Sequence, residues 1–146
     1  MNLLTPVSEL MTKELITVNP ADRLMAVRKI FDENKIHHIP VVRFRKIVGI
    51  ISKSDLLYFM KGLGTVNNPV DINQGRLLIT QAQDIMTTGL AKLAPTDRIN
   101  VALEVFRENI LHAIPVVEND ELVGILTTHD IIIALADKKL EAGKLS

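Results

Sequence analysis

The chain contains two copies of one unit, and this internal repeat limits its possible folds more than any other feature. When the 146-residue sequence is shifted by 75 residues, residues 7–60 align with residues 82–135 without a gap, and 18 of the 54 aligned positions are identical. A single copy is too small to bury a good hydrophobic core, so we expect the two copies to pack together. The repeat predicts two domains, 7–60 and 82–135, joined by a linker over residues 61–81.

Each copy shows the same order of local patterns, which predicts strand, helix, strand, strand and helix. In the first copy, residues 15–18 are short and aliphatic and precede Asn19-Pro20, which is typical of a strand. Asp22 is expected to cap the following helix, and Asn34 to end it in a left-handed turn. The fold class is therefore α/β, with a three-stranded sheet in each copy. The remaining predicted elements are strands 38–42 and 46–52 with a helix from 53, and, in the second copy, 90–93, 98–109, 113–117, 122–127 and 128–136.

Composition excludes several classes of protein. Lys plus Arg and Asp plus Glu both number 17, so the zero net charge argues against binding nucleic acid through its phosphates. Without cysteine the chain has no disulfide, thiolate metal site or cysteine nucleophile, which fits the reducing cytoplasm where we expect it. No apolar run approaches 18 residues and the chain start lacks a secretory pattern, so we expect no membrane segment. The linker residues 76–80 are compatible with either a strand or a helical turn.

The strongest signal of a site lies where the last strand of each copy meets the second helix. The pattern is Ser52-x-x-Asp55 in the first copy and Thr127-x-x-Asp130 in the second. One interpretation is a capping box, in which hydroxyl and carboxylate satisfy free amides at the helix start. The other is a nucleotide site, in which the hydroxyl and helix start meet a phosphate and the carboxylate accepts from ribose hydroxyls. From spacing alone, both interpretations remain open.

The ordered motifs resemble a pair of CBS (cystathionine β-synthase) domains. The pattern is Met-Thr, Pro, an aliphatic residue with Pro-Val-Val, and Gly with two aliphatic residues before Ser/Thr-x-x-Asp, and it occurs twice over about 130 of the 146 residues. This resemblance implies two tandem CBS domains packed by pseudo-two-fold symmetry. It also implies adenosine-containing ligands, namely AMP, ADP, ATP or S-adenosylmethionine, in clefts between paired repeats.

The same resemblance assigns roles to individual residues of both copies. Asp55 and Asp130 would hold ribose, and Ser52 and Thr127 would meet phosphate. The adenine slots would be lined by backbone near Thr17, Ile39 and Pro40 in the first copy, and near Lys92, Ile114 and Pro115 in the second. A basic pair that reaches phosphate in the family falls on His37 and His38, and the first copy also offers Lys53 to a phosphate. His112 repeats His37, but Ala113 replaces His38, and His129 is a partial substitute.

No catalytic or metal-binding set emerges from the sequence. Adjacent residues of a strand face opposite sides, so His37 and His38 are poorly placed to chelate one metal ion. The chain has no phosphate-binding P-loop and no Gly-x-Ser-x-Gly motif, and the acid–base pair that an enzyme acting on nucleotides needs is absent. We therefore expect a binding protein without a tightly bound cofactor, and not an enzyme.

Two functions follow from these observations. The first is a regulatory, energy-sensing module that binds an adenosyl ligand and signals to a partner protein, since two repeats fill the sequence. The alternative is a structural interaction module without a ligand. In both cases we expect a homodimer, because the apolar runs 56–60 and 131–136 are too long for one buried helix face.

Overall fold

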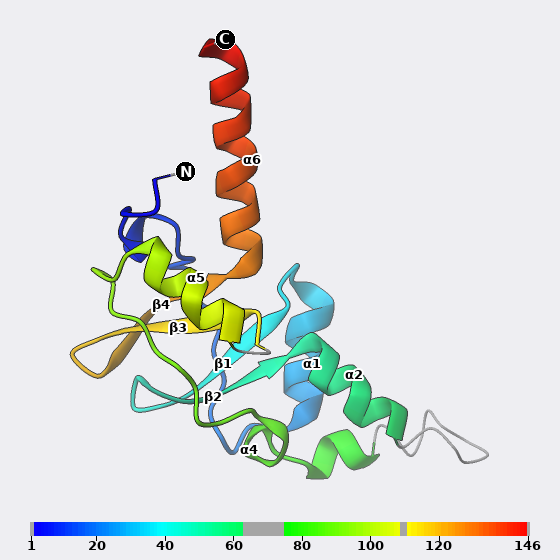
Figure 1. Ribbon diagram of the computed structural model, residues 1–146. Coiled ribbons are helices and arrows are strands. Elements are labelled where there is room, and N and C mark those ends of the chain that lie inside the picture. Colours follow the sequence, from blue (N-terminus) through cyan, green and yellow to red (C-terminus); the bar gives the residue numbers. More distant parts are fainter. Residues whose placement is uncertain (1, 63–74, 109–110, 146) are drawn as a thin grey trace. The chain divides into compact units, whose positions relative to one another are not determined.

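The computed structural model describes residues 2–62, 75–108 and 111–145, with side chains described up to Asp137. It divides into two compact units, shown in Figure 1. The first-repeat unit is Ile16–Gly89, and the second-repeat unit combines Met1–Leu15 with Leu90–Ser146. The units are therefore interleaved along the chain: the segment that begins each sequence repeat belongs to the unit of the other repeat.

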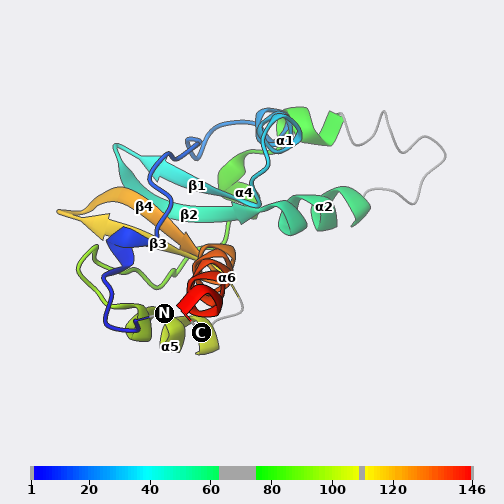
Figure 2. The same cartoon turned by 90° about the horizontal axis from the view of Figure 1, so that it is seen from above.

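The first-repeat unit is built around a β-hairpin. Strands β1 (His38–Arg43) and β2 (Lys46–Ser52) pair in antiparallel fashion, and α2 (Lys53–Gly62) continues directly from β2, as Figure 2 shows. Helix α1 (Leu24–Glu33) turns its apolar side to the core, because Leu24, Val27 and Phe31 recur at helical spacing. The unit also contains α4 (Ala82–Ile85) and a short helix over residues 75–79. Its buried core consists of Val18, Leu24, Val27, Phe31, Ile39, Val41, Ile51, Leu56, Leu77 and Ala82.

The second-repeat unit has the same plan. Its antiparallel hairpin is β3 (Ala113–Glu118) and β4 (Glu121–Thr127), followed without a break by α6 (Thr128–Leu145). Helix α5 (Ile99–Glu108) corresponds to α1, and a short 3-10 helix, η1 (Val7–Glu9), comes from the beginning of the chain. Val7 from η1 is fully buried in this core. The core consists of Val7, Leu93, Ile99, Ala102, Ile114, Val116, Leu126 and Ile131.

The predicted third strand of each copy is reduced to a single bridge. Val18 pairs in parallel with Val41, and Leu93 pairs in parallel with Val116. After Val18 the ladder stops, because the Asn19 amide donates to the Asp22 carboxylate at 2.8 Å and Pro20 has no N–H to donate. The expectation of three full strands was wrong in this respect, and each described sheet has two strands.

Two predicted helix ends also differ from the structure. Asp22 does not cap α1, because its carboxylate closes the turn that begins at Asn19. Arg23 stands at the cap position, where its side chain makes no capping bond and donates instead to the Ile79 carbonyl at 3.0 Å. Asn34 is extended (φ −131°, ψ 145°) and not left-handed. Its side-chain amide donates to the Ile30 carbonyl at 2.9 Å. The Asn34 side chain thus satisfies a helix-end carbonyl that would accept from a backbone N–H if the helix ended in a left-handed turn.

The linker prediction is only partly covered, since residues 63–74 lie outside the described residues. Of its later half, residues 75–79 are helical, which decides between the two structures that the sequence left open. Leu77 in this helix is fully buried in the core of the first-repeat unit. This part of the predicted linker is therefore a structural element. At the other end of the chain, α6 continues to Leu145 and is longer than the predicted helix 128–136.

Candidate functional site

In the first repeat, Ser52 and Asp55 form a reciprocal pair where β2 becomes α2. The Asp55 amide donates to Ser52 Oγ at 3.0 Å, and the Ser52 amide donates to Asp55 Oδ2 at 3.3 Å. The Ser52 and Ser54 hydroxyls are 3.1 Å apart and share a hydrogen bond. The capping-box geometry is therefore present. Because a carboxylate has about four acceptor positions, Asp55 keeps most of its capacity for a ligand.

Further candidate residues gather at the same end of the hairpin. His38 lies directly opposite Ser52 in the β1–β2 register, and the Lys53 amide donates to the His37 carbonyl at 2.8 Å. The start of α2 is thus tied to the start of β1. The backbone of His37, His38, Ser52, Lys53 and Asp55 therefore lies at one end of the hairpin, within one unit. Positive charge and hydroxyl donors suit phosphate, and the carboxylate suits a diol.

Three further residues were predicted to contact adenine in the first repeat. Ile39 and Pro40 are fully buried in β1, so their side chains belong to the core. The Pro40 carbonyl accepts from the Val18 amide at 3.1 Å, which holds the preceding, exposed Thr17 next to β1. Since proline has no N–H, Pro40 can offer a base only the second lone pair of its carbonyl and van der Waals contact.

The second repeat repeats this arrangement with different side chains. The Asp130 amide donates to Thr127 Oγ1 at 3.1 Å, and the Thr127 amide donates to Asp130 Oδ2 at 2.9 Å. The Thr128 amide donates to the His112 carbonyl at 3.0 Å. Opposite Thr127 the register places Ala113, so this unit lacks the imidazole that His38 supplies in the other. His129 is exposed on the first turn of α6.

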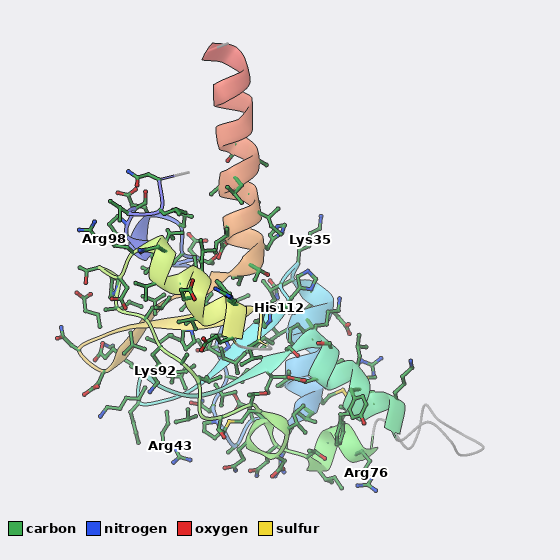
Figure 3. All side chains as sticks on the ribbon, viewed as in Figure 1. Lys35, Arg43, Arg76, Lys92, Arg98 and His112 are labelled. Carbon is green, nitrogen blue, oxygen red and sulfur yellow. The ribbon has the colours of Figure 1, made fainter. Side chains whose placement is uncertain are left out.

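Of the remaining second-repeat residues, Ile114 and Pro115 lie in β3, whereas Lys92 and His112 lie outside it. Ile114 and Pro115 are buried, and the Pro115 carbonyl accepts from the Leu93 amide at 3.0 Å. Lys92 is exposed in the segment that leads to this bridge, whereas His112 immediately precedes β3; Figure 3 labels both side chains. Each half of the predicted site thus falls within one compact unit.

The helix start offers fewer free donors than the sequence pattern suggests. Of the first three amides of α2, that of Lys53 binds the His37 carbonyl and that of Asp55 binds Ser52 Oγ. Among the residues that the structure describes, only the Ser54 amide of these three has no partner in the protein. A phosphate at this point would therefore depend on the side chains more than on the helix amides.

Sequence reasoning missed one contact at the second site. The Thr12 hydroxyl donates to the Asp130 carboxylate, with Oγ1 3.2 Å from Oδ1 and 3.4 Å from Oδ2. These two residues are 118 positions apart. The only available signal was that Thr12 recurs as Thr87 in the second copy. This identity marks a repeated position but indicates no partner.

Neither a metal centre nor a membrane span is found in the described part of the chain. No group of three or more His, Cys, Asp or Glu side chains there is arranged to hold a metal ion. Of the helices described, none is both long enough and apolar enough to cross a bilayer.

Comparison with models of known protein families shows to which family the chain belongs. The model of the CBS domain matches it twice, over residues 7–62 and 82–137. The chain belongs to the CBS-domain family and carries two tandem CBS repeats of mixed α/β structure, which confirms the family and fold class predicted from the motifs.

Two curated relatives are much longer than this chain. Protein MJ1225 of Methanocaldococcus jannaschii is 29% identical over 132 residues, which cover 86% of this chain and 47% of that protein. An inosine-5'-monophosphate dehydrogenase of Korarchaeum cryptofilum is 30% identical over 120 residues, covering 82% of this chain and 22% of the enzyme. The chain therefore spans less than half the length of these relatives, and it matches only part of the dehydrogenase.

Two solved structures show the same fold. CBSX2 of Arabidopsis thaliana, solved in complex with AMP, has a TM-score of 0.74 at 24% identity, covering 92% of this chain and 98% of that one. The CBS domain pair of protein MJ0100, solved with 5'-methylthioadenosine and S-adenosyl-L-methionine, has a TM-score of 0.73 at 25% identity, with the same coverage.

Proposed function

We propose that this chain is a regulatory CBS-pair module that binds an adenosine-containing ligand and passes the bound state to a partner. The observation that carries the proposal is the Ser/Thr-x-x-Asp motif, which both repeats hold in the same geometry at a strand-to-helix junction. The CBS pair of MJ0100, at 25% identity, was solved with two adenosyl compounds. That likeness supports adenosine as the common part of the ligand.

The chemistry of each unit supports a division of roles. Asp55 accepts from the two ribose hydroxyls, because an ionised carboxylate is an acceptor only and can take two donors side by side. Ser52 and Lys53 meet phosphate or another polar group beyond the ribose, and His37 and His38 add donors there. In the second repeat Asp130, Thr127, His112 and His129 take the corresponding places.

The two repeats differ in charge, which favours different ligands. The first repeat has Lys53 at the start of its helix, where the second has the uncharged Thr128. A polyphosphate chain should therefore be held more tightly by residues of the first repeat. We infer that ATP distinguishes the two repeats more strongly than a singly phosphorylated or sulfonium ligand does.

The second candidate is a structural interaction module without a ligand. It is favoured by the observation that the hydroxyl and carboxylate of each motif already bond to one another's backbone amides. A capping box alone accounts for those bonds and contributes about 0.5–2 kcal/mol of stability. Ligand binding separates the two candidates, since capping by itself gives no affinity for adenosine.

A ligand screen tests the proposal directly. The chain is titrated calorimetrically with AMP, ATP and S-adenosylmethionine, and its melting temperature is measured with each compound. A ligand at 100 times its dissociation constant adds about 2.7 kcal/mol of stability. If none of these compounds gives heat of binding or a higher melting temperature, the ligand-free module is correct.

Asp55→Ala should weaken binding at the first site by about 1.5–3 kcal/mol, the usual range for a hydrogen bond to a charged group. This corresponds to a loss of roughly 10- to 150-fold in affinity. The matched control is Asp84→Ala, because Asp84 accepts from the Gln81 amide at 2.8 Å in the capping box of α4. Asp84→Ala removes the same kind of local bond but should leave affinity unchanged. Equal losses in both variants would assign the effect to stability and not to the ligand.

The bound state must reach another protein surface. Exposed apolar side chains occur on α2 at Leu57 and Tyr58, and on α6 at Ile132, Ile133 and Leu135. We infer that these helix faces join two copies of the chain in a homodimer. The output then acts on a further partner or on another part of a longer protein, as the longer relatives allow.

A further inference from the structure

The two Asp carboxylates have different surroundings, although the motifs around them match. Asp55 accepts one bond within the described residues, from the Ser52 amide at 3.3 Å. Asp130 accepts from the Thr127 amide at 2.9 Å and from the Thr12 hydroxyl, which contacts both of its oxygens. The Asp130 carboxylate is therefore more fully engaged before any ligand arrives.

Thr12 is held in this position by the backbone. Its amide donates to the Ile125 carbonyl at 2.8 Å, and the Ile125 amide donates to the Thr12 carbonyl at 3.0 Å. Ile125 is two residues before Thr127 on β4, so this bridge brings the Thr12 hydroxyl to the site. The hydroxyl is thus placed by two main-chain bonds and does not depend on a flexible segment.

The first repeat supplies an internal comparison. Thr87 makes the same two main-chain bonds with Ile50, at 2.9 and 3.0 Å. Within the described residues, its hydroxyl makes no bond to Asp55. The backbone arrangement is the same in both units, but among the described residues only those of the second unit place the threonine hydroxyl on the carboxylate.

We propose that Thr12 is a specificity-determining residue that weakens the second adenosyl site by competing with ribose for the Asp130 carboxylate. The inference rests on the proposed function and adds a cause of inequality between the two sites. A ribose diol donates two O–H groups, and at Asp130 it must share or displace the donor that Thr12 already supplies. Because Thr12 is exposed, the ligand can reach and displace it, so the second site is weakened but not closed.

The test isolates the second site. Asp55→Ala weakens the first site roughly 10- to 150-fold, so that the second site dominates AMP binding. AMP is then titrated calorimetrically into this variant with and without Thr12→Val. Valine keeps the branched shape but has no hydroxyl to donate. We expect about two- to tenfold tighter binding with Thr12→Val, the range for the net contribution of one hydrogen bond. Thr12→Ser keeps the hydroxyl and should bind as the Asp55→Ala variant does.

The matched control is made at the first site. Asp130→Ala weakens the second site, so that AMP binding then reports mainly on the first site. Adding Thr87→Val to this variant should not change the affinity of the first site for AMP. The role of Thr12 is overturned if adding Thr12→Val to the Asp55→Ala variant leaves AMP binding unchanged or weaker without lowering the melting temperature. The proposed function would still stand in that case. If the unmodified chain binds neither AMP, ATP nor S-adenosylmethionine, the proposed function fails and this inference fails with it.

Discussion

At the scale of single residues, the two hairpin turns show where the chain holds backbone strain. Phe44 (φ 50°), Arg45 (φ 66°), Asn119 (φ 51°) and Asp120 (φ 64°) have left-handed backbone, as two-residue hairpin loops require. Asn and Asp tolerate this region, whereas a bulky side chain such as Phe pays roughly 1–2 kcal/mol. Phe44 is 90% exposed, so its packing does not offset the cost.

Phe44→Asn should therefore stabilise the chain. We expect a gain of about 0.5–1 kcal/mol in the free energy of unfolding, since Asn adopts the left-handed region with less strain. Urea denaturation followed by circular dichroism measures the difference. The reciprocal change, Asn119→Phe, should cost a similar amount. A loss of stability in Phe44→Asn would mean that Phe44 makes a stabilising contact in the assembled protein.

At the scale of elements, one close approach shows how the segment that begins each sequence repeat packs on a hairpin. A Cβ atom on Gly49 would lie 2.5 Å from Met86 Sδ, and one on Gly124 would lie 2.5 Å from Met11 Sδ. Glycine is needed at both positions because the methionine lies directly against the backbone of the strand. The same packing therefore occurs once in each unit.

Gly49→Ala should destabilise the protein by about 1–3 kcal/mol, the usual cost of an added methyl group in a packed site. Met86→Ala makes room for that methyl group, so the double variant should lose less stability than the sum of the single variants. Gly75→Ala is the control, because a Cβ there meets nothing within 4 Å. Melting temperatures of the four variants decide the question. Strict additivity would show that the contact does not restrict position 49.

At the scale of the whole molecule, the second helix of each repeat buries one side and exposes the other. Leu56 and Ile131 are buried, whereas Leu57 is 52%, Tyr58 82% and Ile132 61% exposed. Aliphatic and aromatic side chains that remain exposed on helices favour association. A two-fold dimer would cover them with the same surfaces of a second copy.

The expected assembly is therefore a homodimer at micromolar concentration, as measured by light scattering. Leu57→Glu and Ile132→Glu should each shift the equilibrium towards monomer, because a charge in an apolar interface is costly. Val101→Glu on α5 is the control, since Val101 is exposed but outside these helix faces. A wild-type monomer, or glutamate variants that remain folded dimers, would refute the interface.

The sequence by itself determined the repeat, the family and most of the elements. The hairpins and the helices α1, α2, α5 and α6 depend on local apolar periodicity and on turns between neighbouring residues, and both can be read along the chain. The Ser/Thr-x-x-Asp junctions were predictable for the same reason. Sequence reasoning failed at Asp22, because the nearby Asn19 amide competes for its carboxylate. It also failed at the predicted third strands. The length of such a strand depends on where its backbone N–H groups stop being available for pairing with the neighbouring strand.

Only the tertiary structure decided which of two equivalent residues in the repeats contacts which partner. Met11 and Met86 are the same residue at equivalent positions, as are Gly49 and Gly124, so the pattern alone does not specify their pairing. The structure pairs Met11 with Gly124 and Met86 with Gly49, and the first of these pairings carries Thr12 to Asp130. Periodicity describes residues that are close in sequence, whereas Met11 and Gly124 are 113 residues apart and Gly49 and Met86 are 37 residues apart. The path of the folded chain selects between identical partners.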